Sequence, residues 1–158
     1  MKKIYFASPL FSEMELMFNA SVVAKIREAY PEIVVYLPQE NGAINDKQAY
    51  ADSLAIANGD NEQLLSSDLV IAILDGISVD VGVASEIGIA FAKGIPVIGV
   101  YTDSRQQGAD NIKKINALKE VAENQFSYVN LYTVGLIKQN GVIVTNSNQA
   151  VEEIKNFI

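Results

Sequence analysis

The sequence contains no cysteine and no histidine among its 158 residues. Without these residue types the chain cannot build a thiol nucleophile, a Ser-His-Asp triad, an iron–sulfur cluster or a zinc site of cysteine or histidine ligands. Any catalysis must therefore use carboxylates, tyrosine, serine or lysine. We expect no metal ion and no cofactor.

Basic residues are also scarce, with 12 Lys and Arg against 19 Asp and Glu and a formal net charge of −7. Because contacts with phosphate groups need concentrated positive charge, this acidic balance argues against nucleic acid as a partner. No apolar run approaches the roughly 18 residues of a membrane-spanning helix, so we expect no membrane partner either.

The N-terminus superficially resembles a signal peptide, because two lysines precede an apolar run. Ser8 and Pro9 interrupt that run, and Glu13 and Glu15 follow it. We interpret the segment as a first β-strand rather than a leader. The default expectation is a bacterial-type cytoplasmic protein, which the lack of cysteine permits.

Apolar segments with the character of strands alternate along the chain with segments that predict helices. The predicted strands span residues 4–7, 33–37, 69–74, 96–101 and 142–144. The predicted helices span residues 12–30, 46–67, 82–93 and 110–124, a brief stretch ending at residue 139, and residues 147–158. This alternation predicts an α/β fold. We expect a single domain over residues 1–158, with three αβα layers and a flavodoxin-like or Rossmann-like open parallel sheet of about five strands.

Local signals refine several of these boundaries. Ser12 and Glu15 have the spacing of a capping box, which predicts a helix N-terminus there. Gly94 occupies the position of the glycine that ends a helix. Two further glycines predict breaks: Gly59 within the helix of residues 46–67, and Gly141 in an Asn-Gly turn.

The continuous apolar run of residues 69–74 is typical of a central parallel strand covered on both faces. In open parallel sheets ligands bind beyond the carboxyl ends of the strands, so the loop of residues 75–82 is the first place to search for a site. Neither the G-x-G-x-x-G pattern nor the P-loop pattern occurs in the chain. Dinucleotide binding and P-loop chemistry therefore lack sequence support.

The loop ends instead in an acid, Asp80, and a second acid, Glu86, follows one turn into the next helix, both set among small residues. Small neighbours such as Gly82 leave room for a ligand. A glutamate in the first turn of a helix lies at the positive end of the helix dipole, which favours its ionised form and a role as nucleophile. Acids at a helix N-terminus are also ordinary structural choices. On spacing alone the structural explanation is the stronger one, and Asp60 and Asp68 share that ambiguity.

Several elements nevertheless occur together in the order seen in one known family. They are residues 4–6, Asp60 and Asp68 ahead of the apolar strand, the helix of residues 80–90 followed by residues 94–96, and Asn130 with Leu131. Over nearly its whole length the chain resembles the nucleoside 2-deoxyribosyltransferases. The acid, glycine and Glu-x-Gly-x-Ala pattern of residues 80–90 is the most specific element of this resemblance, and the loop after Leu37 is the least specific.

The resemblance implies transfer of a 2′-deoxyribosyl group between nucleobases, a reaction of nucleoside salvage. Glu86 would attack C1′, displace the base and form a covalent deoxyribosyl-enzyme, which a second base resolves with net retention. Tyr5 matches the tyrosine that orients the nucleophilic carboxylate, although a buried tyrosine is also an ordinary core residue. Asp60 matches the acid that exchanges a proton with the base. Asp68 is interpreted as structural.

The resemblance also implies the substrate contacts. Asp80 and Asn130 match positions that hold the 5′ end of the sugar, with Asn130 contributed to a neighbouring subunit's active site. The implied protein is a homo-oligomer, a dimer or a hexamer, whose partners are a 2′-deoxynucleoside and a free nucleobase. Gly82, Ser8 and Gln39 complete the candidate substrate-binding residues.

The residue at position 80 bears on the substrate. In the related 2′-deoxynucleoside 5′-phosphate N-hydrolases a serine typically stands at the position of Asp80. Because a carboxylate repels a phosphate at short range, the resemblance favours a substrate with a free 5′-hydroxyl.

Two other functions stay open at this point. Water in place of the second base would make the protein an N-glycosidase of a 2′-deoxynucleoside or its 5′-monophosphate. A non-catalytic module that senses a nucleoside or nucleotide would use the same pocket without turnover, although such a module has no need of a nucleophile at Glu86. Purine or pyrimidine preference is undetermined, because Gln39 and Asn41 are only candidates for base contacts in the loop of residues 39–45.

Overall fold

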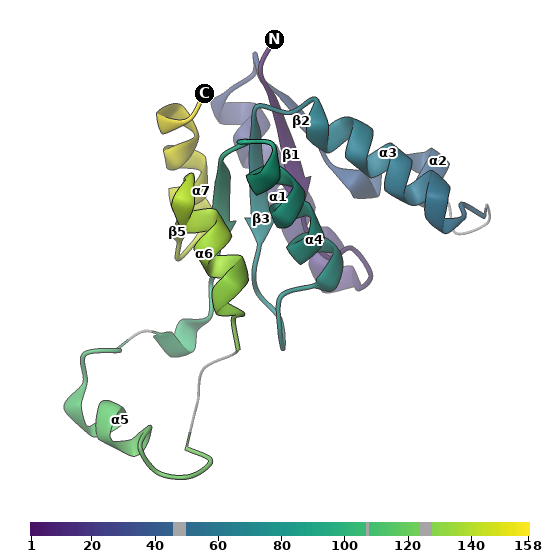
Figure 1. Ribbon diagram of the computed structural model, residues 1–158. Helices are drawn as coiled ribbons and strands as arrows, with labels where there is room; N and C mark the ends of the chain where they lie inside the picture. The colour runs from purple at the N-terminus through teal and green to yellow at the C-terminus, as the bar shows by residue number, and fades with distance from the viewer. Residues whose placement is uncertain (46–49, 107, 124–127) are drawn as a thin grey trace.

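The chain forms a five-stranded parallel sheet with the strand order β2-β1-β3-β4-β5 (Figure 1). The computed structural model describes residues 1–45, 50–106, 108–123 and 128–158. The strands are β1 (Lys3–Ala7), β2 (Val34–Tyr36), β3 (Leu69–Ile73), β4 (Val97–Val100) and β5 (Gly141–Val144). The predicted open parallel α/β sheet is confirmed.

Helices cover both faces of this sheet (Figure 1). The α-helices are α1 (Glu13–Ala29), α2 (Gly42–Asn45), α3 (Ser53–Leu65), α4 (Val81–Ala92), α5 (Ile112–Ala117), α6 (Leu131–Gln139) and α7 (Ser147–Glu153). Short 3₁₀ turns form η1 (Pro38–Glu40), η2 (Ser104–Gln106) and η3 (Ile154–Asn156). The α1 and α7 helices pack on one face, and α3, α4 and α6 pack on the other. Within the described ranges, no helix is long and apolar enough to cross a membrane.

The β3 strand is central, and all of its residues are buried. Leu69, Ile71 and Ile73 face the core beneath α1, whereas Val70 and Ala72 face the core beneath α4. Burial on both faces explains why its sequence shows no alternation of apolar and polar residues. After β1 the chain enters α1 on one face of the sheet, and after β3 it enters α4 on the other face. The carboxyl ends of these two strands therefore border the crevice where such folds bind ligands.

Two predicted helix ends are confirmed. The Ser12 hydroxyl accepts a hydrogen bond from the backbone N of Glu15 at 3.3 Å, and the Glu15 carboxylate accepts one from the backbone N of Ser12 at 2.7 Å. This reciprocal pair is the predicted capping box of α1. Gly94 follows α4 with φ of +69°, a conformation that glycine adopts without steric cost.

The predicted helix of residues 46–67 is shorter in the structure. The α3 helix starts at Ser53, because the side chain of Asp52 caps it by accepting from the backbone N of Ala55 at 2.8 Å. Residues 46–49 lie outside the described residues. Gly59 lies within α3 and does not interrupt it.

Two other predicted helices also differ from the structure. Of residues 110–124, only Ile112–Ala117 is α-helical; Ala122 has φ of +70°, which no α-helix contains, and residue 124 lies outside the described residues. The last helix changes at Ile154 into the 3₁₀ turn η3.

Gly141 does not form the predicted turn, because β5 begins at this residue and pairs there with Val97 of β4. A Cβ atom built on Gly141 would lie 1.9 Å from the Val97 carbonyl oxygen. Glycine is therefore required by the close approach of two strands.

We expect Gly141→Ala to lower the free energy of unfolding by about 2 kcal/mol or more, because the two backbones must separate to admit the methyl group. Gly135→Ala in α6 is the matched control, since a Cβ there meets nothing within 4 Å. Alanine is also the better helix former by up to about 1 kcal/mol. Urea denaturation measures both variants, and an unchanged midpoint for Gly141→Ala would contradict the close approach.

Candidate active site

A part-buried hydrogen bond joins β1 to α4 near the carboxyl edge of the sheet. The Tyr5 hydroxyl donates to Glu86 Oε1 over 2.5 Å. Tyr5 is fully buried in β1, where it pairs with Val70 and Tyr36 on the neighbouring strands. The second carboxylate oxygen of Glu86, Oε2, makes no hydrogen bond to the described residues.

Asp60 lies on α3 beside this pair. It is half-buried, and its charge acts on Tyr5, Tyr36 and Glu86. Leu64 follows one turn later on the same face of α3 and is fully buried in the core beneath α4. Burial of Leu64 holds this end of α3 on the sheet and thereby places Asp60 next to Glu86. The structure thus brings together the three predicted catalytic residues.

Burial dominates the electrostatics of the site and raises the pKa of Glu86 to about 7. The hydrogen bond from Tyr5 opposes this rise, and the charges of Asp60 and Asp80 add to it. Burial also raises the pKa of Asp60, against which hydrogen bonding with the Tyr36 hydroxyl acts. The pKa of Tyr5 is raised, first by burial and then by the Glu86 carboxylate, so Tyr5 stays a donor. Glu86 is therefore poised to gain or lose a proton near neutral pH.

The expectation that the helix dipole keeps Glu86 ionised is wrong. The α4 helix begins at Val81 behind its N-cap Asp80, so Glu86 is in the second turn. The influence of the dipole falls off within the first turn, whereas desolvation acts wherever a carboxylate is buried. The spacing of residues in the sequence gives no information on how deeply Glu86 is buried.

Asp80 caps α4 with a single carboxylate oxygen. Its Oδ2 accepts from the backbone N of Gly82 at 2.8 Å and of Val83 at 3.1 Å. Its Oδ1 makes no hydrogen bond to the described residues and is available to a ligand. A Cβ on Gly82 would lie 3.0 Å from Oδ2, so glycine leaves room for the cap. Asp80 and Gly82 therefore lie together at the start of α4, close enough for Asp80 to act on Glu86.

Ser8 and Gln39 are the other predicted substrate contacts. Ser8 directly follows β1 and is 7% exposed, and its Oγ has no hydrogen-bond partner in the described part of the chain. Gln39 in η1 is already engaged: its Nε2 donates to the Leu16 carbonyl at 3.0 Å, and its Oε1 accepts from Asn19 at 3.1 Å. Gln39 therefore fastens η1 to α1 rather than pointing towards Glu86.

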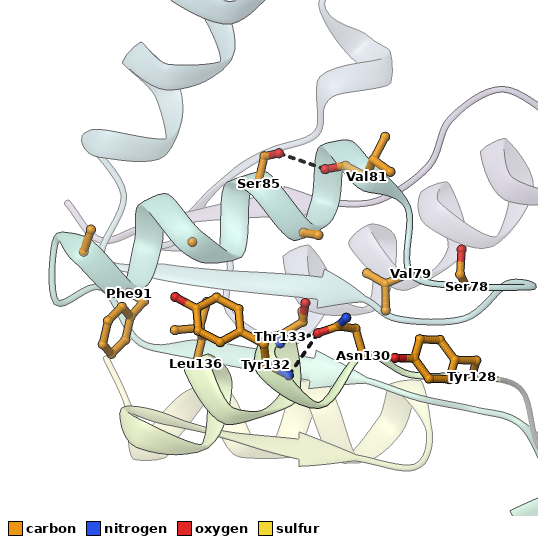
Figure 2. A pocket seen from close by; sticks show the side chains of 13 residues that line it. Ser78, Val79, Val81, Ser85, Phe91, Tyr128, Asn130, Tyr132, Thr133 and Leu136 are labelled. Carbon is orange, nitrogen blue, oxygen red and sulfur yellow. Dashed lines mark hydrogen bonds between the residues drawn. The ribbon is translucent and has the colours of Figure 1, made fainter.

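Asn130 lies in a groove of about 730 Å³ between α4 and α6 (Figure 2). It caps α6, because its Oδ1 accepts from the backbone N of Tyr132 at 2.9 Å. Its Nδ2 makes no hydrogen bond to the described residues. The α4 helix contributes Ala84 and Gly88 to this groove, whereas Glu86 points towards β1. Asn130 and Glu86 of one chain therefore lie on opposite faces of α4.

The described lining of this groove contains no carboxylate and no basic side chain. Proton transfer and nucleophilic attack need ionisable groups. We therefore place the chemistry at Glu86 and Asp60, and we regard the groove as a surface for contact.

The sequence patterns did not point to Tyr36. It is the last residue of β2, and its ring stacks on that of Tyr5 with the centroids 5.4 Å apart. Asn41, which sequence reasoning took as a candidate for base contacts, donates from Nδ2 to the Tyr36 hydroxyl at 3.0 Å. The available signal was a tyrosine in each of two neighbouring strands. Recognising it requires the strand register, which aligns Tyr5 with Tyr36.

Asp68 has the structural role predicted for it. Its carboxylate accepts from the backbone N of Lys3 at 2.9 Å and from the Lys2 Nζ at 3.0 Å. These contacts join the start of β3 to the start of β1, at the edge of the sheet opposite the site.

The arrangement comprises an ionisable carboxylate, a tyrosine hydrogen-bonded to it and a second acid nearby. Attack of one carboxylate on a carbon, with protonation of the leaving group by the other, is chemistry that such a pair can perform. The described residues contain no group of three or more acids that could hold a metal ion.

The profile described as nucleoside 2-deoxyribosyltransferase matches residues 4–148 of this chain. The chain belongs to the nucleoside 2-deoxyribosyltransferase family. The matched range includes Tyr5, Asp60, Glu86 and Asn130, and it confirms the resemblance seen in the sequence.

Solved structures share the three-layer fold of the family. A conserved protein from Enterococcus faecalis V583 is 61% identical, with a TM-score of 0.93 over 100% of this chain and 99% of that one. A 2-desoxiribosyltransferase from Leishmania mexicana is 20% identical, with a TM-score of 0.66 over 100% of both chains. A CMP N-glycosidase from Clostridium botulinum is 16% identical, with a TM-score of 0.51 over 99% of this chain and 100% of that one. No curated protein matches the chain.

The raised pKa of Glu86 predicts a dependence of stability on pH. Its pKa in the folded chain is about 7 against an ordinary value of 4.5, so folding disfavours the ionised form. The stabilising contribution of the protonated form is complete below pH 4.5 and is lost as the pH rises to about 7. We expect Glu86→Gln, which cannot ionise, to gain roughly 2–3 kcal/mol relative to wild type across this range.

Urea denaturation at intervals between pH 4 and 8 measures this difference. Glu152→Gln on α7 is the matched control, because that side chain is exposed and α7 covers the other face of the sheet. The control should keep the pH profile of the wild type. If the difference in stability between Glu86→Gln and wild type stays constant with pH, the raised pKa of the Glu86 carboxyl is contradicted.

Proposed function

We propose that the protein transfers 2′-deoxyribosyl groups between nucleobases through a covalent intermediate on Glu86. The observation that carries the proposal is a buried carboxylate with one oxygen bound by Tyr5 and a second acid, Asp60, beside it. Membership of the nucleoside 2-deoxyribosyltransferase family supports the same assignment. The reaction belongs to nucleoside salvage.

In the first step Glu86 Oε2 attacks C1′ of a 2′-deoxynucleoside, and the bond from C1′ to the base nitrogen breaks. An ester forms between Glu86 and the sugar, while Asp60 gives a proton to the departing base. Tyr5 keeps its hydrogen bond to Oε1 of Glu86 and so directs Oε2 towards the sugar. A sugar without a 2′-hydroxyl reaches the oxocarbenium-like transition state more easily, which suits a carboxylate acting alone.

In the second step a nitrogen of another base attacks C1′, the ester breaks and Glu86 is released as a carboxylate. The attacking base returns its proton to Asp60, which restores the starting state. Two displacements at the same carbon give net retention of configuration. If water took the place of the second base, the same ester would give hydrolysis, so hydrolysis is the alternative outcome of this chemistry.

Asp80 supports a donor with a free 5′-hydroxyl. Its Oδ2 is occupied by the cap of α4, and its Oδ1 can accept a hydrogen bond from a hydroxyl group. A 5′-phosphate at the same place would meet a negative charge at short range. The proposed donor is therefore a nucleoside rather than a nucleotide.

The proposed transfer predicts base exchange that depends on Glu86. Wild-type protein incubated with 2′-deoxyinosine and free adenine or cytosine should form a new deoxynucleoside, which chromatography resolves. Glu86→Gln should lower the rate by about a thousandfold or more, because an amide forms no glycosyl ester. Glu152→Gln, on the opposite side of the sheet, should exchange bases at the wild-type rate.

The other outcomes of this experiment each have a meaning. Release of hypoxanthine without a new deoxynucleoside would replace transfer by hydrolysis. Turnover that does not change between wild type and Glu86→Gln would contradict the nucleophile. Absence of any turnover across several purine and pyrimidine donors would favour a nucleoside-sensing module over an enzyme.

We further propose that the active site is completed by a second copy of the chain, through Asn130. The groove between α4 and α6 is lined by exposed apolar side chains, Val81 at 82%, Tyr132 at 76% and Tyr128 at 66% (Figure 2). Apolar surface of this kind marks protein interfaces. Asn130 faces away from Glu86 of its own chain, and its Nδ2 makes no hydrogen bond within the described part of the chain. Both observations support a role for this amide at a neighbour's substrate.

Complementation between two inactive variants tests this arrangement. Asn130→Asp keeps the oxygen that caps α6 and removes the amide donor, so it should lose activity without unfolding the helix. Co-expression with Glu86→Gln should restore up to roughly a quarter of the wild-type sites, because mixed dimers contain one site with both native residues. Recovery requires that Asn130 act in a neighbouring chain. No recovery in purified mixed dimers would place Asn130 and Glu86 in the same site of one chain.

A further inference from the structure

Residues 108–123 form an arm that projects from the rest of the chain between β4 and α6 (Figure 1). None of the side chains of this arm is buried, and none belongs to either of the two apolar cores. In Figure 1 the helix of the arm, α5, lies well apart from the sheet and from the other labelled helices. The rest of the same chain therefore leaves α5 uncovered.

The α5 helix has an apolar side. Ile112, Ile115 and Leu118 are spaced three residues apart, so they lie on one side of the helix. In the single chain Ile112 is 68% exposed and Ile115 is 37% exposed. The helix has only six residues. Helices shorter than about 12 residues are marginal in water and depend on the packing of an apolar side, so we expect another surface to cover this one.

The position of the arm favours a second copy of the chain as that surface. Tyr128 and Asn130, which follow the arm along the chain, line the groove between α4 and α6 (Figure 2). This is the groove where we place the contact with a second copy. A copy that contacts the groove is therefore beside the arm, and one interface can include both.

Charge favours the same partner. The α5 helix contains Lys113 and Lys114 and no acid. The whole arm has three basic and three acidic residues. Outside the arm the chain has nine basic residues against sixteen acidic ones, so the net charge of −7 lies there. Two acidic bodies repel each other, whereas the basic helix of one copy is attracted to the acidic body of another.

We propose that the arm of one copy packs on the body of a second copy, with Ile112, Ile115 and Leu118 in the contact. In a two-fold arrangement each copy extends one arm and receives the other. The proposal rests on the association of two copies that the proposed function includes. It depends neither on base exchange nor on the role of Asn130.

Because the chain has no cysteine, a single introduced thiol can report the contact. Ile115→Cys places the only thiol on the apolar side of α5, and the rate of its reaction with 5,5′-dithiobis(2-nitrobenzoate) measures its accessibility. Lys113→Cys is the matched control, since residues two positions apart point to different sides of a helix. In the dimer, identified by light scattering, the thiol of Ile115→Cys should react about tenfold or more slowly than the control, and dilution to the monomer should remove the difference.

A second variant tests the contact without a thiol. Ile112→Asp should raise the Kd of the dimer by about tenfold or more, because the contact would bury an unpaired charge. Ile112 lies outside both cores, so the substitution leaves the fold of the single chain intact. Glu152→Gln on α7, which covers the other face of the sheet, should leave the Kd unchanged.

The outcomes separate this proposal from the proposed function. Equal reaction of the two thiols in a verified dimer would overturn the packing of the arm on a second copy. Slow reaction of the Ile115→Cys thiol in a verified monomer would place the arm on its own chain and overturn the proposal as well. A protected arm in dimers that show no Glu86-dependent base exchange would keep the contact and overturn the transferase function alone.

Discussion

The hydrogen bond from Tyr5 to Glu86 is the interaction on which the rest of the site depends. It joins two residues 81 positions apart in the chain, one in a central strand and one in a helix. A carboxylate in a buried place needs a donor, or it loses its charge. Tyr5 supplies that donor to one oxygen and leaves the second oxygen unbound. A single contact therefore sets the direction of the carboxylate and opposes the desolvation that would keep it protonated.

The topology explains why the site gathers residues from distant segments. Because β1 lies between β2 and β3, the side chains of Tyr5 and Tyr36 share one face with α3 and α4. Asp60 reaches this face because Leu64 anchors the end of α3 in the same core. The two acids of the candidate site are thus carried by helices, and the tyrosines beside them are carried by strands. Rigid elements on both sides limit the movement of either acid.

Much of the fold could be predicted because its signals are local. The apolar run of β3 and the caps at Ser12 and Gly94 depend on a few adjacent residues, and the spacing of the family pattern singled out Glu86 and Asp60, whose catalytic roles remain predictions. The rest depends on packing between distant segments. Tyr36 could be found only from the register of β1 with β2, and the raised pKa of Glu86 depends on what covers α4.

The cap at Asp80 has a consequence for how this fold can evolve. Helix caps accept aspartate, asparagine and serine almost equally well, and only Oδ2 of Asp80 is used to cap α4. Replacement by serine would preserve the helix while removing the negative charge that we propose lies beside the 5′ end of the sugar. Under that proposal, exchange of this one residue could move a lineage between sugars that end in a hydroxyl and sugars that end in a phosphate, without first acquiring stability elsewhere in the chain.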